Sequence, residues 1–193
     1  MILGIDVGRV LISPGDSTKP DTSFLHGPLE TALDTPPYDD MFDTVPALVE
    51  RFEGRVWIVS KCGPRIQQRT LQWFAHHRFF ERTGIARGNV RFCLQRPDKA
   101  IHCRELGIAH FIDDRADVLE PMSGIVPNRY LFGPQRGRVP AGLRHVMTWR
   151  DAMEVVVPQA SDARPENGTA PALWQHQALD LGPPGFEPGT KGL

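Results

Sequence analysis

Short apolar runs alternate with segments of helical periodicity along most of the chain. The runs that predict strands are residues 2–5, 56–59, 90–94, 110–112 and 129–132. Apolar residues spaced three and four apart predict helices at 41–52, 66–80, 98–106 and 114–119, with a last strand and helix within 145–157. Such alternation is typical of βαβ units, so we expect an α/β fold, a Rossmann-like three-layer α/β/α sandwich with a mostly parallel sheet.

Two segments interrupt this pattern. Residues 13–40 are rich in Pro, Gly, Ser, Thr and Asp, which predicts a flap with little regular structure. Residues 158–193 lose the apolar periodicity, and eleven of these 36 residues are Pro or Gly, so we expect a disordered tail. The sequence therefore predicts one domain over 1–157, with the flap inside it, followed by the tail.

The tail contains Gly-Phe-Glu-Pro-Gly at 185–189. The sequence GGGTTCGAACCC, of the kind found in the T-arm of transfer-RNA genes, encodes Gly-Phe-Glu-Pro. We hypothesise that the tail is read-through into a neighbouring transfer-RNA gene, and any other codon pattern in the genomic DNA would refute this.

The charge composition bears on whether the protein binds nucleic acid. The net charge is −1 and no run of like charge occurs, so the charge balance gives no sign of a nucleic-acid partner. The basic residues Arg129, Arg136, Arg138 and Arg144 lack interleaved aromatic residues, and we interpret them as a solvated surface.

Compartment and membrane association follow from the cysteines and the apolar runs. Cys62, Cys93 and Cys103 have no C-x-x-C spacing, which indicates reduced, partly buried thiols. The first residues lack a basic leader, and no segment has the roughly 20 apolar residues that a membrane helix requires. We expect a soluble, cytoplasmic protein without a membrane partner.

Chemically active side chains follow the predicted strands. Asp6, Ser60 and the pair Asp113-Asp114 come directly after apolar runs, and Lys99 comes shortly after another. Ligands of parallel sheets bind beyond the carboxyl ends of the strands, so these residues should converge on one edge. Each alone has a plain structural explanation as a cap or a turn residue. Adjacent carboxylates at a sheet edge are harder to explain, because they repel one another unless a cation is present.

Together these residues supply the parts of phosphoryl transfer. Asp6 can act as a nucleophile, and Asp113 with Asp114 or Asp117 offers the hard oxygen ligands that Mg²⁺ prefers. Ser60 can bind phosphoryl oxygens, and Lys99 can neutralise charge at the nucleophile and the phosphate.

The chain resembles the haloacid-dehalogenase-like (HAD) superfamily in four segments in order: GIDVGRV (4–10), WIVSK (57–61), RPDKA (96–100) and HFIDD (110–114). The resemblance spans roughly residues 1–133 and implies a Rossmann-like sheet, Mg²⁺ dependence and phosphatase or phosphotransferase activity. It implies catalytic roles for Asp6 and Lys99. It also implies a metal site formed by Asp6, the Gly8 carbonyl, Asp113 and Asp114. Ser60, Lys61 and Arg9 would bind the substrate, although an exposed turn arginine explains Arg9 equally well.

One position departs from the family pattern. Phosphatases of this superfamily usually carry a second Asp two residues after the nucleophile as general acid and base, and here that position is Gly8. General acid–base assistance contributes about 10²–10⁴-fold to rates. The protein could hydrolyse only esters with good leaving groups, recruit an acid from the flap (Asp16, Asp39, Asp40 or a histidine), or bind without turnover.

Three hypotheses follow. The first is a small, uncapped Mg²⁺-dependent phosphohydrolase acting on a small phosphomonoester through an aspartyl-phosphate, with an open site or one closed by the partner subunit of a homodimer. The second, favoured by Gly8, is a HAD-like module that binds Mg²⁺ or a phosphorylated partner without turnover. The third, C–halogen hydrolysis at Asp6, needs no metal, so Asp113 and Asp114 count against it.

Overall fold

The structure is a computed structural model that describes residues 1–14 and 22–157. Its centre is a six-stranded parallel sheet in the order β3-β2-β1-β4-β5-β6. The strands are β1 (Leu3–Ile5), β2 (Val56–Lys61), β3 (Val90–Cys93), β4 (His110–Asp113), β5 (Asn128–Phe132) and β6 (Arg144–Val146). The predicted tail lies outside the described residues, as does part of the flap, residues 15–21.

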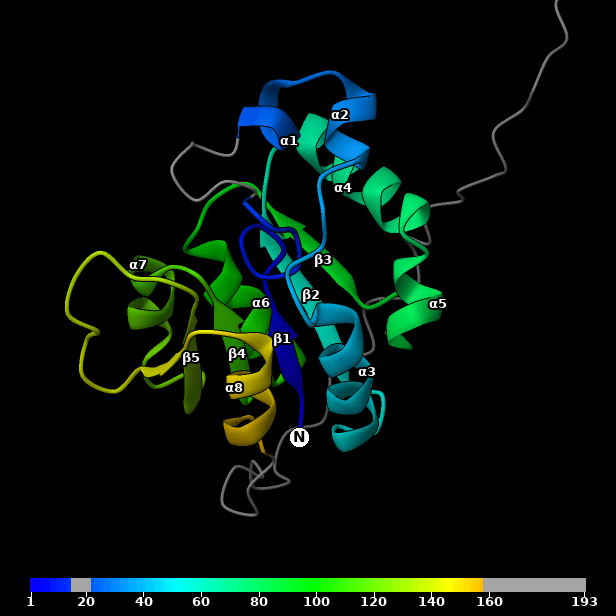
Figure 1. Ribbon diagram of the computed structural model, residues 1–193. Helices are drawn as coiled ribbons and strands as arrows, with labels where there is room; N and C mark the ends of the chain where they lie inside the picture. Colours follow the sequence, from blue (N-terminus) through cyan, green and yellow to red (C-terminus); the bar gives the residue numbers. More distant parts are fainter. Residues whose placement is uncertain (15–21, 158–193) are drawn as a thin grey trace, which may run out of the picture.

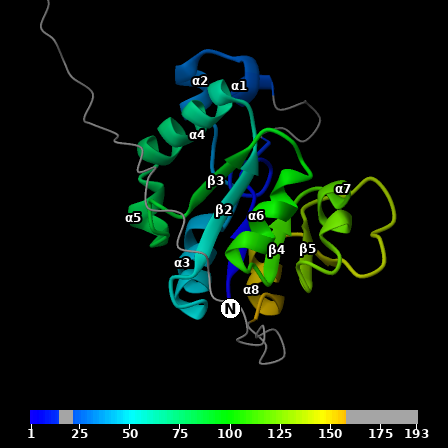
Figure 2. The same ribbon diagram turned by 180° about the vertical axis from the view of Figure 1, so that it is seen from behind.

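Helices cover both faces of the sheet, which confirms the three-layer α/β/α prediction (Figures 1 and 2). One face packs against α3 (Met41–Arg51), α4 (Pro64–His76), α5 (Phe79–Thr83) and α8 (Trp149–Val155) in the larger apolar cluster. The other face packs against α6 (Asp98–Leu106), α7 (Ala116–Leu119) and the 3₁₀ turn η1 (Glu120–Met122). Successive strand residues alternate between the two clusters, as the pleat requires.

Close packing between β1 and β4 depends on Gly4. A Cβ atom at this position would lie 2.4 Å from the Phe111 ring, which packs over β1 in the smaller apolar cluster. The glycine therefore lets the two central strands share a tightly packed face.

Strand order reverses between β1 and β4. The chain builds outward from β1 through β2 to β3 at one edge, returns through α6 to β4 on the other side of β1, and continues to β5 and β6. In open parallel sheets such a reversal opens a crevice beyond the strand ends, where ligands bind. The residues following β1 and closing β4 are Asp6 and Asp113.

The helix predicted at 66–80 is divided in the structure. It ends at His76, Arg78 adopts a left-handed conformation with φ of 52°, and α5 begins at Phe79. The break allows the Phe79 ring to stack on Phe74 at 4.3 Å between centroids. Burial of this aromatic pair outweighs helix continuity, which apolar spacing alone does not reveal.

The prediction of little regular structure in the flap was wrong for residues 22–33. Residues 22–33 contain the short helices α1 (Thr22–His26) and α2 (Leu29–Leu33), which lie beyond the carboxyl ends of the strands (Figure 1). Each helix has five residues, too few to show a helical period among the surrounding Pro and Thr residues. Packing of α2 against α4 stabilises this segment instead.

Candidate functional site

Asp6 and Asp113 face each other at the point where the strand order reverses. Asp6 follows β1, and its backbone N–H donates to the carbonyl of Ile112 at 3.0 Å, which ties the end of β1 to β4. Asp6 is 7% exposed and Asp113 is fully buried. Two carboxylates held in an apolar sheet edge require positive charge close by.

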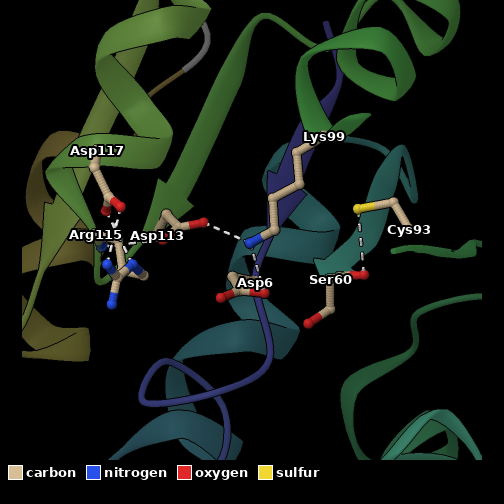
Figure 3. Close-up of polar contacts among 7 residues, drawn as sticks. All are labelled: Asp6, Ser60, Cys93, Lys99, Asp113, Arg115 and Asp117. Atoms are coloured by element: carbon tan, nitrogen blue, oxygen red, sulfur yellow. Dashed lines mark hydrogen bonds and ion pairs between the residues drawn. The ribbon is translucent and has the colours of Figure 1, made fainter. Parts of the chain in front are cut away.

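Lys99 supplies that charge. It lies in the first turn of α6, is 2% exposed, and directs its Nζ between the two carboxylates (Figure 3). Nζ lies 2.7 Å from Oδ2 of Asp113 and forms an ion pair with Oδ1 of Asp6 at 2.9 Å. The structure thus joins three residues that the sequence predicted as one site.

The second oxygen of Asp113 is also bound. Its Oδ1 accepts a hydrogen bond from the backbone N–H of Arg115 at 3.0 Å. The Arg115 guanidinium turns to Asp117, with two hydrogen bonds of 2.9 Å each. Asp117, a predicted alternative to Asp114 as a metal ligand, is therefore engaged by Arg115 and does not belong to the carboxylate cluster.

Asp114 completes a cluster of three acids. One carboxylate oxygen from each of Asp6, Asp113 and Asp114 lies within 4.8 Å of the others. Burial, then the charge of Asp6, raises the pKa of Asp114 to about 6. The same two causes raise the pKa of Asp113 well above its ordinary value, against the opposing effect of Lys99. The cluster thus holds more negative charge than this environment favours.

The pKa of Lys99 changes in the opposite sense. Burial alone would lower it, but the carboxylates of Asp6 and Asp113 outweigh burial and raise the pKa above its ordinary value. Lys99 therefore stays charged at neutral pH. Lys99 forms ion pairs with Asp6 and Asp113, while the charge of Asp114 is offset only in part by Arg115 and Arg9, so its pKa stays raised. A bound divalent cation would offset the remaining negative charge of the cluster.

This cluster fits a divalent cation. Its donors are carboxylate oxygens, which Mg²⁺ prefers, and the buried Oδ1 of Asp6, which forms an ion pair with Lys99, is one of the oxygens that lie close together. Asp6, Asp113 and Asp114 are the residues that would hold the ion. The remaining coordination positions of a magnesium ion are usually filled by water and phosphate.

A cavity of about 360 Å³ opens next to the cluster. Asp6, Ser60, Lys61, Lys99 and Asp114 all line it. Ser60 is 6% exposed and lies near the end of β2, on the strand beside Asp6 (Figure 3). Lys61, the last residue of β2, is exposed. The cavity therefore meets every strand end that the sequence singled out.

Gly8 and Arg9 form a tight turn at the cavity. The Val7 carbonyl accepts hydrogen bonds from Leu11 and Ile12 at 2.9 and 3.1 Å. Arg9 adopts a left-handed conformation with φ of 59°, uncommon for a residue with a side chain, and it lines the cavity. A Cβ atom on Gly8 would meet nothing within 4 Å, so packing does not require glycine there.

None of the described candidates to replace the missing acid lines the cavity. Asp39 is exposed, and Asp40 pairs with Arg150 through contacts of 2.8 and 2.9 Å. His26 also does not line it. Asp16 lies outside the described residues.

The structure adds lining residues that sequence reasoning missed. Arg96 and Arg115 line the cavity from the connections after β3 and β4, while Phe24 and Leu25 line it from α1. An arginine in a connection gives no sequence signal, because most such residues are solvated. The two apolar residues lie in a segment without clear periodicity.

The three cysteines are free and buried, which agrees with the expected reduced thiols. Burial raises the thiol pKa to about 12 for Cys62 and Cys103 and to about 11 for Cys93. Although Cys62 lines the cavity, such a thiol is almost fully protonated at neutral pH and is a poor nucleophile.

In comparisons with protein-family models and with curated proteins, the chain matches no family and no relative. Within residues 1–14 and 22–157, no helix is both long and apolar enough to cross a membrane.

Proposed function

We propose that the protein is a Mg²⁺-dependent phosphohydrolase of the HAD type, acting on a small phosphomonoester through an aspartyl-phosphate on Asp6. The observation that carries the proposal is the Lys99 bridge, with Nζ 2.9 Å from Asp6 and 2.7 Å from Asp113 in a buried three-carboxylate cluster. A buried lysine that holds a carboxylate in place beside a cation site is what a phosphoryl-accepting aspartate requires.

The charge of the cavity supports an anionic substrate. Of the residues that the structure describes, two acidic side chains line it, Asp6 and Asp114, together with five basic ones: Arg9, Lys61, Arg96, Lys99 and Arg115. A bound Mg²⁺ would act as a Lewis acid, offsetting the charge of the phosphate and the carboxylates.

The proposed reaction has two steps, formation and hydrolysis of an acyl phosphate on Asp6. In the first, Asp6 attacks phosphorus and the ester oxygen leaves with its electron pair, forming the Asp6 acyl phosphate. Ser60 and Lys61 hold phosphoryl oxygens, and Lys99 orients Asp6 and offsets negative charge. In the second, water attacks phosphorus and gives a proton to solvent, the bond from phosphorus to the Asp6 oxygen breaks, and phosphate leaves as the Asp6 carboxylate is restored. The leaving oxygen takes its proton from solvent, because Gly8 offers none.

The absence of a side chain at Gly8 favours a second candidate, a module that binds Mg²⁺ and a phosphorylated ligand without turnover. Among the described residues, Asp6 and Asp114 are the only carboxylic acids lining the cavity. If the protein is instead the phosphohydrolase, its slow step is the departure of a leaving group that receives no proton. Esters with good leaving groups therefore separate the two functions, because only the phosphohydrolase would turn them over.

A phosphatase assay with p-nitrophenyl phosphate tests the proposal, with and without Mg²⁺, on the wild type and on Asp6→Asn. We expect Mg²⁺-dependent turnover that Asp6→Asn abolishes. The control Asp117→Asn changes an acid that lies outside the cluster and should retain turnover. Absence of turnover in the wild type, with Mg²⁺ binding retained, would favour the binding module.

Two further predictions accompany this function. Three buried free thiols suit a reducing compartment, so we expect the protein in the cytoplasm. A second copy of the chain, in a homodimer, is one way to close the cavity during turnover.

A further inference from the structure

Helix α4 and His77, the residue that follows it, carry a row of three side chains directed at the α1–α2 segment (residues 22–35). Arg69, Trp73 and His77 are spaced four apart and so lie along one face. Arg69 Nη1 donates to the Phe24 carbonyl at 2.7 Å, and Trp73 Nε1 donates to the Thr35 carbonyl at 2.8 Å. His77 Nε2 lies 2.9 Å from the Leu33 carbonyl. Three backbone carbonyls of one segment are therefore bound by side chains of α4 and His77.

The Arg69 and Trp73 contacts are buried, and the His77 contact is partly buried. Trp73 is fully buried, Arg69 is 7% exposed, and the His77 ring packs on Trp73 at 4.3 Å between centroids. Breaking a buried hydrogen bond leaves a donor or acceptor unsatisfied, which costs more than the bond itself contributes. The row thus fixes the position of the α1–α2 segment over the strand ends (Figures 1 and 2).

The fixed segment brings apolar side chains to the cavity. Phe24, whose carbonyl Arg69 binds, and the adjacent Leu25 both line it, together with Ile12 and Ile66. Leu25 is 37% exposed, so much of its surface is open to an occupant. The cavity therefore combines basic side chains at the strand ends with an apolar region, and its volume of about 360 Å³ leaves room for a group attached to the phosphate.

We infer that the substrate is a phosphomonoester whose leaving group is apolar, an aryl or branched alkyl group, and that Phe24 and Leu25 select it. Arg69 is a positioning residue, which acts by holding the Phe24 backbone. This inference rests on the proposed function, since the phosphate must bind at the strand ends. An aryl group also suits a site in which Gly8 offers no proton donor, because a phenolate leaves more readily than an alkoxide.

Binding of unreactive analogues tests the inference independently of turnover. Phenylphosphonate and methylphosphonate share the anionic group and differ in the apolar one. We would measure their affinities by calorimetry with Mg²⁺, at a pH where both are dianions. We expect the wild type to bind phenylphosphonate about tenfold or more tightly than methylphosphonate. Leu25→Ser should reduce this ratio about threefold or more.

The positioning role of Arg69 has its own test. Arg69→Met removes the hydrogen bond to Phe24 but keeps an unbranched apolar chain, and we expect it to reduce the ratio of the two affinities about threefold or more. Arg69→Lys, which retains a donor, should restore part of the ratio. Arg65→Met changes an exposed arginine of the same helix and should keep the wild-type ratio.

The outcomes separate this inference from the proposed function. Equal affinity of the wild type for both phosphonates would overturn the inference and leave the proposed function standing. Failure to bind either one would overturn both. If Arg69→Met does not fold, Leu25→Ser alone tests whether the apolar region selects the leaving group. An unchanged ratio of the two affinities in Leu25→Ser would contradict the role of the apolar region.

Discussion

The cavity is bounded by two regions held in place by different forces. The charged strand edge (Asp6, Lys99, Asp113 and Asp114) is held by the ion pairs of buried Lys99 with Asp6 and Asp113, and burial raises the pKa of Asp114 to about 6. The α1–α2 segment is held by hydrogen bonds from side chains of α4 and His77 to its backbone carbonyls. The first region responds to pH and cations, whereas the second responds to loss of single donors.

This difference indicates that the two regions have separate functions in the proposed reaction. The charged strand edge contains the groups proposed for chemistry, at the ends of β1 and β4 and in the first turn of α6. The α1–α2 segment contains apolar side chains that recognise what is attached to the phosphate. Substitutions in one region should therefore leave the other largely intact, and the predictions below test that separation.

The largest expected effect is a change in turnover rate on substitution of Gly8. Gly8→Asp would restore the proton donor, and the open space around the position allows a side chain. We expect turnover of alkyl phosphates to rise by about 10²–10⁴-fold. The matched control is Gly8→Asn, of similar size but unable to supply a proton, which should show no such gain. Equal rates for Gly8→Asp and Gly8→Asn would mean that proton donation is not the missing function.

Lys99→Met should destabilise the charged strand edge strongly. It leaves the carboxylates of Asp6 and Asp113 buried without their cation, and breaking a buried ion pair from one side costs about 3–5 kcal/mol. Urea unfolding measures the loss. Mg²⁺ should restore part of the stability, because it supplies positive charge to the same oxygens. Lys61→Met, at an exposed lysine, should change the unfolding free energy by less than about 0.5 kcal/mol. Similar losses in the two variants would argue against the ion pair.

Asp114 should make stability fall as pH rises. Its pKa in the folded protein is raised to about 6, so folding favours the protonated form. The stability it contributes is full below its unfolded pKa and is lost as pH rises through about 6. Asp114→Asn lacks this titration, so its stability relative to the wild type should increase by about 2 kcal/mol between about pH 4 and pH 7. Saturating Mg²⁺ should remove the increase by favouring the charged wild type. A difference independent of pH would contradict the shift.

The two regions also differ in how well the sequence predicted them. Asp6, Ser60 and Asp113 could be placed together because each ends an apolar run, and the carboxyl ends of parallel strands share an edge. The place of the α1–α2 segment beside the cavity could not be predicted, because five-residue helices have too few positions to show a helical period. The hydrogen bonds that fix it join residues 38 to 45 positions apart, which local patterns do not encode. The helix break at Arg78 escaped prediction for a related reason, since aromatic stacking decided it.

The smallest expected effect is a change in hydrogen exchange on substitution of Trp73. Trp73→Phe retains most of the aromatic packing but removes the Nε1–H donor to the Thr35 carbonyl. Loss of one such bond costs about 1 kcal/mol, so hydrogen exchange within residues 22–35 should accelerate about fivefold. Exchange in β1 and β4 should stay unchanged. Equal acceleration throughout the sheet would show that the two regions are not independent.

The central claim is that Asp6 becomes phosphorylated, and chemical trapping tests it most directly. Borohydride reduces an acyl phosphate of aspartate to homoserine, so protein quenched during turnover with Mg²⁺ can be reduced, digested and examined by mass spectrometry. We predict homoserine at position 6 when substrate and Mg²⁺ are both present, and none when either is omitted. Turnover without modification of residue 6, or with modification at residue 113 or 114 instead, would contradict the account.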